Sequence, residues 1–204
     1  GLTLPFHGLG KIAEFARPRK YTEDLAKNIV GKFSAAKEEA SKLYKNALQG
    51  NEKLNLYEST ANPSTYLHLG EDELKDWYTP KLKKLHKTFL NEPTLDNAHI
   101  LQSELGRMSS SKPVGSVDKK LNDSYRFAQE LLNGDIKNAL LKHDVNAYEA
   151  YTKANDFYRD TVSPFKSTKT LSLISRGKYD EIKPSQLQKA LKKAITEKDI
   201  GTEH

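Results

Sequence analysis

The sequence predicts an all-α protein, folded as an irregular, elongated bundle of six to nine helices. Apolar residues make up only 36% of the 204 residues and charged residues 29%, a composition that suits helices burying one stripe and exposing the rest. Every long periodic segment repeats near 3.6 residues, and none alternates as a strand does. No repeat of fixed length indicates a solenoid.

The chain begins with residues 1–20, where prolines and glycines separate a few apolar residues, so we expect an irregular arm. A long helix follows over about 22–49. Thr22 is its expected N-cap, and Gly50 its stop. Its apolar residues recur at helical spacing: Leu25, Ile29, Phe33, Ala36, Ala40, Leu43 and Ala47.

The next segment, 51–69, lacks helical spacing and contains Asn62-Pro63, so it is expected to be a loop. GEDELKDWYTPKLKKLHKTFLNEP then predicts two joined helices. Thr79 and the proline after it mark the start of the second, because proline suits the first helical position. Thr94 is expected to cap a further helix.

SSSKPVG, at 109–115, is the clearest linker in the chain, and a second long helix is expected over about 117–142. Asn133-Gly134 could interrupt or bend that helix. We interpret residues 21–199 as a single domain, with two subdomains divided at 109–115 as an alternative. Residues 200–204 are interpreted as a tail or a tag remnant.

YEAYTKANDFYRDTVSPF, at 148–165, holds five of the eighteen aromatic residues. It is expected to be helical until shortly before Pro164. A wheel places its aromatic stripe inward, with Tyr148 and Phe157 flanking: Ala147, Tyr151, Ala154, Tyr158 and Val162. The opposite face is mainly acidic, which predicts a packing helix and not a platform for nucleic acid. Short helices near 168–176 and from Pro184 complete the chain.

Signatures of catalysis are missing from the sequence. There is no cysteine, and no two of the six histidines have the spacing that places two metal ligands on one helix face. No nucleophile elbow, phosphate loop or dinucleotide fingerprint occurs. We therefore predict a non-enzymatic protein, with no catalytic, cofactor-binding or metal-binding residue and no evident small-molecule substrate. A carboxylate site assembled by the fold stays open as an alternative.

No apolar run approaches the roughly 20 residues that a membrane-spanning helix needs, and no signal peptide is evident at the N-terminus. These features predict a soluble chain without an integral membrane segment. Gly1 in place of Met suggests a fragment or a trimmed chain, so neither end is given functional weight.

The formal net charge is +6, and two predicted helices concentrate lysines on one side. These form the candidate phosphate-contact surface: Lys83, Lys84, Lys87, Lys189, Lys192 and Lys193. Such stripes could neutralise phosphates without reading sequence. A solvated helix face is the commoner reason for lysine on a helical protein, and arginine is scarce here.

The C-terminal half combines a long helix, the Ala-Asn-x-x-Tyr string in YTKANDFYRD, Val-x-Pro-Phe at 162–165, and Gly177 before Lys183-Pro184. With PTLDNAHILQSELGRM upstream, this pattern over about 93–190 resembles helical regions of large bacteriophage structural proteins, particularly the internal virion proteins ejected with DNA. The resemblance implies a non-enzymatic virion or prophage module, located in the virion or the host cytoplasm. Its partners would be other virion proteins or further copies of itself.

Two readings of function thus stand beside the carboxylate alternative. The first is a structural and interaction module that works through helix-face contacts. The second is a DNA-associated protein that uses the lysine stripes for sequence-independent binding, which weakens steeply as salt rises.

Overall fold

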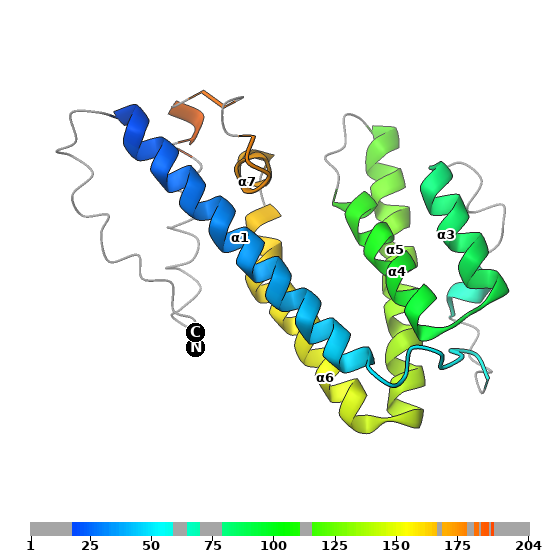
Figure 1. Ribbon diagram of the computed structural model, residues 1–204. Coiled ribbons are helices and arrows are strands. Elements are labelled where there is room, and N and C mark those ends of the chain that lie inside the picture. The colour runs from blue at the N-terminus through cyan, green and yellow to red at the C-terminus, as the bar shows by residue number, and fades with distance from the viewer. Residues whose placement is uncertain are drawn as a thin grey trace, which may run out of the picture. The chain divides into compact units, whose positions relative to one another are not determined.

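The computed structural model describes residues 18–58, 65–69, 79–110, 116–166, 169–178, 182–183, 185–187 and 189 (Figure 1). Its α-helices are α1 (Pro18–Leu48), α3 (Pro80–Asn91), α4 (Leu95–Ser109), α5 (Ser116–His143), α6 (Val145–Phe157) and α7 (Lys169–Ser175). Short 3-10 segments occur at η2 (Tyr66–His68) and η4 (Ser163–Lys166), and a π-turn at η3 (Tyr158–Val162). The predicted all-α class with two long helices is confirmed.

Helix α1 begins about four residues earlier than predicted, at Pro18 and not at about residue 22. The physical reason is that proline at a first helical position presets φ and lacks only an N–H that would have no partner there. The predicted arm therefore ends sooner, and residues 1–17 lie outside the described residues. At the other end the prediction was right: α1 stops at Leu48, and Gly50 has a φ of +84°.

Side-chain caps begin three of the helices as their sequences indicate. Thr79 Oγ1 accepts a hydrogen bond from Leu82 N at 3.2 Å, and Thr94 Oγ1 accepts one from Asn97 N at 3.4 Å. Asp144 does the same for Ala147 N at 3.0 Å. The restart at Thr79 and Pro80 is thus confirmed, whereas the helix expected just before it falls mainly on residues that the structure does not describe.

Helix α5 is continuous, so the break or bend considered at Asn133-Gly134 does not interrupt it. Both residues keep helical backbone because the Asn133 side chain turns to a partner on another helix, described below, and does not compete for its own backbone.

The chain divides into two compact units. One comprises residues 1–37 with 161–204, and the other residues 38–160. The segment 109–115, considered from the sequence as a subdomain boundary, lies inside the second unit. The reason is that α4 and α5, the helices on either side of it, pack directly against each other.

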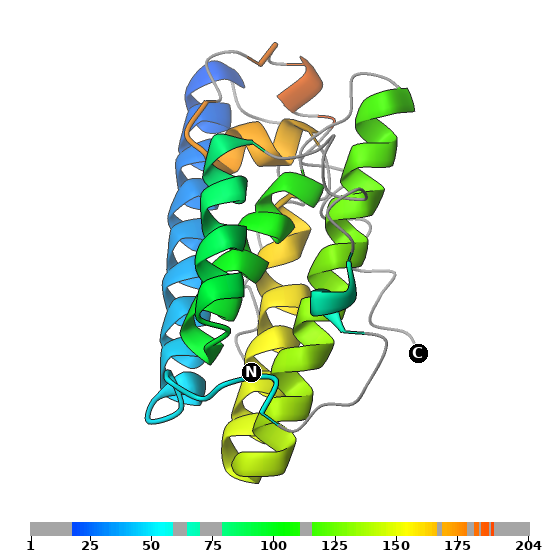
Figure 2. The same cartoon turned by 90° about the vertical axis from the view of Figure 1, so that its right-hand side faces the viewer.

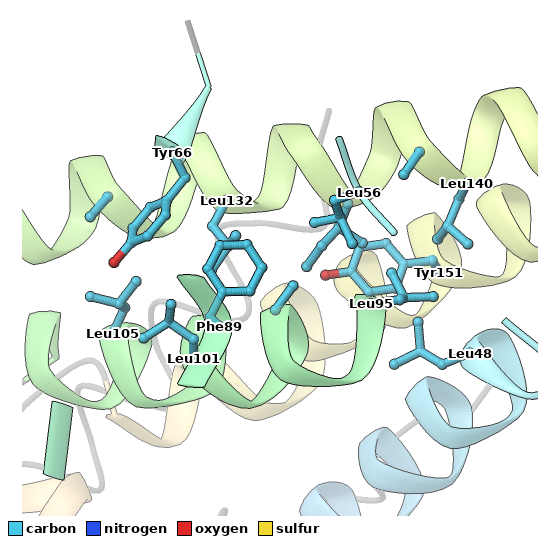
Figure 3. Close-up of a cluster of buried hydrophobic side chains, with 14 of the residues drawn as sticks. Leu48, Leu56, Tyr66, Phe89, Leu95, Leu101, Leu105, Leu132, Leu140 and Tyr151 are labelled. Carbon is cyan, nitrogen blue, oxygen red and sulfur yellow. The ribbon is translucent and has the colours of Figure 1, made fainter. Parts of the chain in front are cut away.

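In the larger unit, α4 packs against both α3 and α5, and α5 packs against α6 (Figures 1 and 2). Figure 3 shows Tyr66 and Phe89 toward one end of the shared core and Tyr151 and Leu140 toward the other. The fully buried members include leucines from three of the helices and from the loop after α1: Leu56, Leu82, Leu95, Leu101, Leu105, Leu132 and Leu140. One isolated antiparallel bridge, between Asn55 and Thr94, fastens that loop to the start of α4.

The smaller unit has its own cluster of buried residues, formed by the first part of α1, by α7 and by the segment after it: Ala26, Ile29, Leu171, Ile174, Ile182 and Leu187. Phe165 packs on this cluster, and its ring centroid lies 5.5 Å from that of Phe33. Gly177, with a φ of +75°, follows α7 as predicted.

The aromatic stretch is a packing helix, as its wheel predicts. Ala147, Tyr151, Ala154 and Val162 are buried. The four charged residues of the opposite face are exposed: Glu149, Lys153, Asp156 and Asp160. Arg159 pairs with two of them, Asp156 and Asp160, so its charge is balanced on that face.

Candidate functional site

The lysine surface proposed from the sequence is only partly described. Lys83, Lys84 and Lys87 are exposed on one side of α3, while Leu82 and Phe89 of the same helix are buried. No ion pair joins these three lysines to another described residue. Lys189 is also exposed, and Lys192 and Lys193 lie outside the described residues. The described part of the surface is therefore one solvated, basic helix face.

A network of polar side chains lies inside the larger unit, among α4, α5 and α6. Tyr151 donates its hydroxyl to Gln102 Oε1 at 2.9 Å, and Gln102 Nε2 donates to Asn133 Oδ1 at 3.0 Å. The same Asn133 oxygen lies 3.4 Å from Asn155 Nδ2. Asn133 thus accepts from two amides and ties three helices together.

Helix α1 joins this network through Tyr44, whose hydroxyl donates to Asn155 Oδ1 at 2.8 Å. Burial raises the pKa of both Tyr44 and Tyr151, so these hydroxyls stay protonated donors. The His99 ring packs against both tyrosine rings, and burial lowers its pKa, which keeps it neutral near pH 7. Its Nδ1 has no hydrogen-bond partner among the residues that the structure describes.

A second buried polar site is centred on Asp135 of α5. One of its oxygens accepts from the Tyr57 hydroxyl at 2.7 Å and from the Tyr66 backbone N–H at 2.8 Å. Burial raises the pKa of this carboxyl, and the bond from Tyr57 opposes that rise. The Tyr66 hydroxyl lies 2.7 Å from His86 Nδ1 on α3. Asp135 therefore fastens the loop after α1 onto the helices.

The third buried polar group is Glu104 of α4, whose side chain is 5% exposed. Arg107 Nη2 lies 2.6 Å from its Oε1, and Lys81 Nζ lies 2.8 Å from its Oε2. The Arg107 guanidinium is the main reason why the pKa of this carboxyl falls to about 2, and the bond from Lys81 adds to it. Both cations remain largely in water, so the cluster joins α3 to α4 at the edge of the core.

Each of these arrangements joins different elements of the larger unit. Asp135 and Glu104 have protein donors on their carboxylates, which is the way buried carboxylates are satisfied structurally. Within the described residues, no three His, Cys, Asp or Glu side chains gather as metal ligands. No described helix combines the length and the apolar character needed to cross a membrane.

Large apolar side chains also lie exposed on the helix surfaces. They are Leu67, Leu90, Ile100, Phe127, Leu141 and Val145. Phe127 is 55% and Leu141 49% exposed, and both project from α5. Exposed single apolar residues are normal on proteins, whereas a contiguous exposed apolar patch marks a contact surface.

The sequence predictions did not include the polar core residues, although one of these residues has a visible signal in the sequence. Gln102 occupies the same helical register as Ala98, Leu101 and Leu105, which marks a core-facing polar residue. Asn133 and Asn155 have no comparable signal, since asparagine is equally common at exposed positions and only the partner helices reveal its role. Comparison with protein-family models, with curated proteins and with solved structures finds no match for this chain.

Proposed function

We propose that this protein is a non-enzymatic structural and interaction module of a phage or prophage particle. It would work through helix-face contacts with virion proteins or with further copies of itself. The observation that supports this role is the contrast between an interior whose polar groups bond mainly to one another and a surface that exposes Phe127 and Leu141. A hydrogen-bonded interior keeps the helices in one rigid arrangement, and exposed apolar side chains can bind another protein.

The phage assignment rests on the resemblance over about 93–190. Two residues of its Ala-Asn-x-x-Tyr string have packing roles here: Ala154 is buried, and Asn155 bonds to Tyr44 and Asn133. The string therefore fits a helix-packing module, which is the kind of protein that the resemblance implies.

Particle composition tests the proposal. Phage or induced prophage particles from the source strain would be purified on a density gradient, washed at high salt, and analysed by quantitative mass spectrometry. We expect this chain in the particles at a fixed ratio to the capsid protein. Its absence from particles that contain all other structural proteins would overturn the proposal, as would a genomic neighbourhood of metabolic genes.

A DNA-associated role is the second candidate, favoured by the exposed lysines on α3. Replacing Lys83, Lys84 and Lys87 by glutamine should weaken binding to generic duplex DNA and reduce the slope of log K against log salt by about 3. A matched control replaces three dispersed, exposed lysines, Lys27, Lys45 and Lys153, so that net charge changes equally. Equal loss in both variants, or binding indifferent to salt, would remove the DNA role.

A further inference from the structure

A row of residues runs along α5 on the side away from the core. It consists of Phe127, Leu131, Gly134, Asn138 and Leu141, and is called here the outer stripe. The steps between its members are four, three, four and three residues, the heptad spacing of a helix-pairing seam. The core-facing residues of the same helix lie about half a turn away: Tyr125, Leu132, Ile136 and Leu140.

The outer stripe exposes two large apolar side chains to solvent. Phe127 is 55% and Leu141 49% exposed, although both are large and apolar. Leu131 is half-buried and also packs against the core cluster, Gly134 is half-buried, and Asn138 is exposed. Helix α5 therefore buries one apolar side in the larger unit and exposes two large apolar residues, Phe127 and Leu141, near the opposite side.

Gly134 adds a second, independent observation. Glycine weakens a helix interior relative to alanine, yet a Cβ built at Gly134 meets no atom within 4 Å. Packing within this chain therefore does not require glycine there. A glycine in the middle of an apolar stripe does allow the backbone of a second helix to approach closely.

Charges beside the outer stripe indicate how such a helix would run. Glu130 and Lys137 both flank the stripe on the same edge, and neither forms an ion pair with another described residue. On the other edge, Ala128 and Asp135 are buried. Only an antiparallel copy of α5 brings the edge with Glu130 and Lys137 against its own equivalent, so that opposite charges meet twice.

From these observations we infer that α5 is the contact between two copies of this chain, packed antiparallel along the outer stripe about a two-fold axis near Gly134. Phe127 of each copy then meets Leu141 of the other, Gly134 meets Gly134, and Glu130 meets Lys137. The inference rests on the proposed interaction role and names one partner for it. Asn138 places a polar side chain within the seam, which lowers the stability of a helix pair. One helix face is also a small contact compared with the roughly 800 Å² that each partner buries in a stable complex. The dimer should therefore be weak and reversible.

Sedimentation equilibrium of the full chain, from low micromolar to several hundred micromolar concentration, tests the inference. We expect a monomer–dimer equilibrium. Phe127→Ser should raise the dissociation constant roughly tenfold or more, because it removes the largest apolar side chain of the contact on both copies. Glu130→Lys and Lys137→Glu should each weaken the dimer, and the double reversal should restore it. A chain that stays monomeric throughout would overturn the inference.

Glycine variants separate dimerisation from folding. Gly134→Ala should raise the melting temperature measured at a concentration where the chain is monomeric, because alanine favours helix, and should also raise the dimer dissociation constant. Gly31→Ala is the control: Gly31 lies exposed in α1 with open space at its Cβ, so it should raise the melting temperature without changing the dimer. If Gly134→Ala leaves the dimer dissociation constant unchanged, the two copies of α5 do not approach each other at Gly134.

The two proposals can fail separately. A monomeric chain that is nevertheless found in particles would overturn the α5 contact and leave the virion role, with other proteins as partners. A dimer formed through α5 by a chain absent from particles would overturn the phage assignment.

Discussion

Asn133 shows at the scale of one residue how a polar side chain can organise an apolar core. Its oxygen accepts bonds from Gln102 and Asn155 in the larger unit. A buried amide that loses its hydrogen-bond partner still bears the free-energy cost of its removal from water. Arrangements of the helices that break these bonds are therefore disfavoured, so one such residue can hold several helices in a single arrangement.

Asn133→Ala should lower the free energy of unfolding by about 2 kcal/mol, because the amide of Gln102 loses its acceptor in a buried position. Urea denaturation followed by circular dichroism measures the change. Asn46→Ala, at an exposed position of α1, is the control and should change stability by less than about 0.5 kcal/mol. Equal effects of the two substitutions would show that the network does not contribute.

Glu104 couples stability to pH. Its pKa falls from an ordinary value of 4.5 to about 2, chiefly because Arg107 bonds to its carboxylate. A carboxyl with a lowered folded-state pKa stabilises the fold above its unfolded pKa, and that contribution disappears as pH falls from 4.5 toward 2.

Glu104→Gln should therefore lower the free energy of unfolding by roughly 2 kcal/mol at neutral pH and by much less near the folded-state pKa. Urea midpoints across this acid range measure the difference between variant and parent. Exposed Glu149 supplies a control, since Glu149→Gln should change the free energy of unfolding at neutral pH by less than about 0.5 kcal/mol. A constant difference between Glu104→Gln and the parent at all pH values would contradict the ion-pair explanation.

Helix beginnings are the features at the scale of the element that local sequence controls most directly. Thr79 places a side-chain acceptor before Pro80, so the first turn of α3 gains a bond from Leu82 N and has proline at its first position. This combination starts a helix at one residue and no other.

Thr79→Ala should destabilise the protein by about 1 kcal/mol through loss of this cap, and Thr79→Ser should retain most of it. Thr88→Ala is the matched control, because Thr88 lies exposed within the same helix, where alanine is the better helix former. Thermal unfolding followed by circular dichroism distinguishes them. A Thr88→Ala variant as unstable as Thr79→Ala would show that the hydroxyl at position 79 has no special role.

At the scale of the whole molecule, the two units differ in the size of the buried core formed by their described residues. The larger unit has eighteen residues in one buried cluster, and the smaller unit has six. Local opening free energies follow such differences, since elements with fewer buried apolar contacts open more easily.

Hydrogen–deuterium exchange followed by mass spectrometry should therefore find slower exchange in peptides from α4 and α5 than in peptides from α7. Within the long α1, the part near Ala47 and Leu48 belongs to the larger core. It should exchange more slowly than the part near Ala26 and Ile29, which belongs to the smaller one. Uniform protection of all these peptides would show that the protein opens as one cooperative body.

The sequence by itself determined where the long helices lie and where several of them begin or end. The 3.6-residue repeat, the caps at Thr79 and Thr94, and the stops at Gly50 and Gly177 depend on contacts within a few residues, so local sequence is sufficient to specify them. The start of α1 at Pro18 was predicted about four residues too late, and a break or bend of α5 at Gly134 was left open, because proline and glycine are compatible with more than one local structure when their surroundings are unknown.

Only the tertiary structure decided which polar residues lie inside and which apolar side remains outside. Gln102, Asn133 and Asn155 become one network because three helices bring them within hydrogen-bond distance, and spacing along the chain does not encode that approach. In the same way, α5 carries apolar residues on two opposite sides, and packing selects the one with Leu132 and Ile136 for the core. The exposure of Phe127 and Leu141 is the physical consequence of that choice, and it is what identifies the outer stripe as a contact surface.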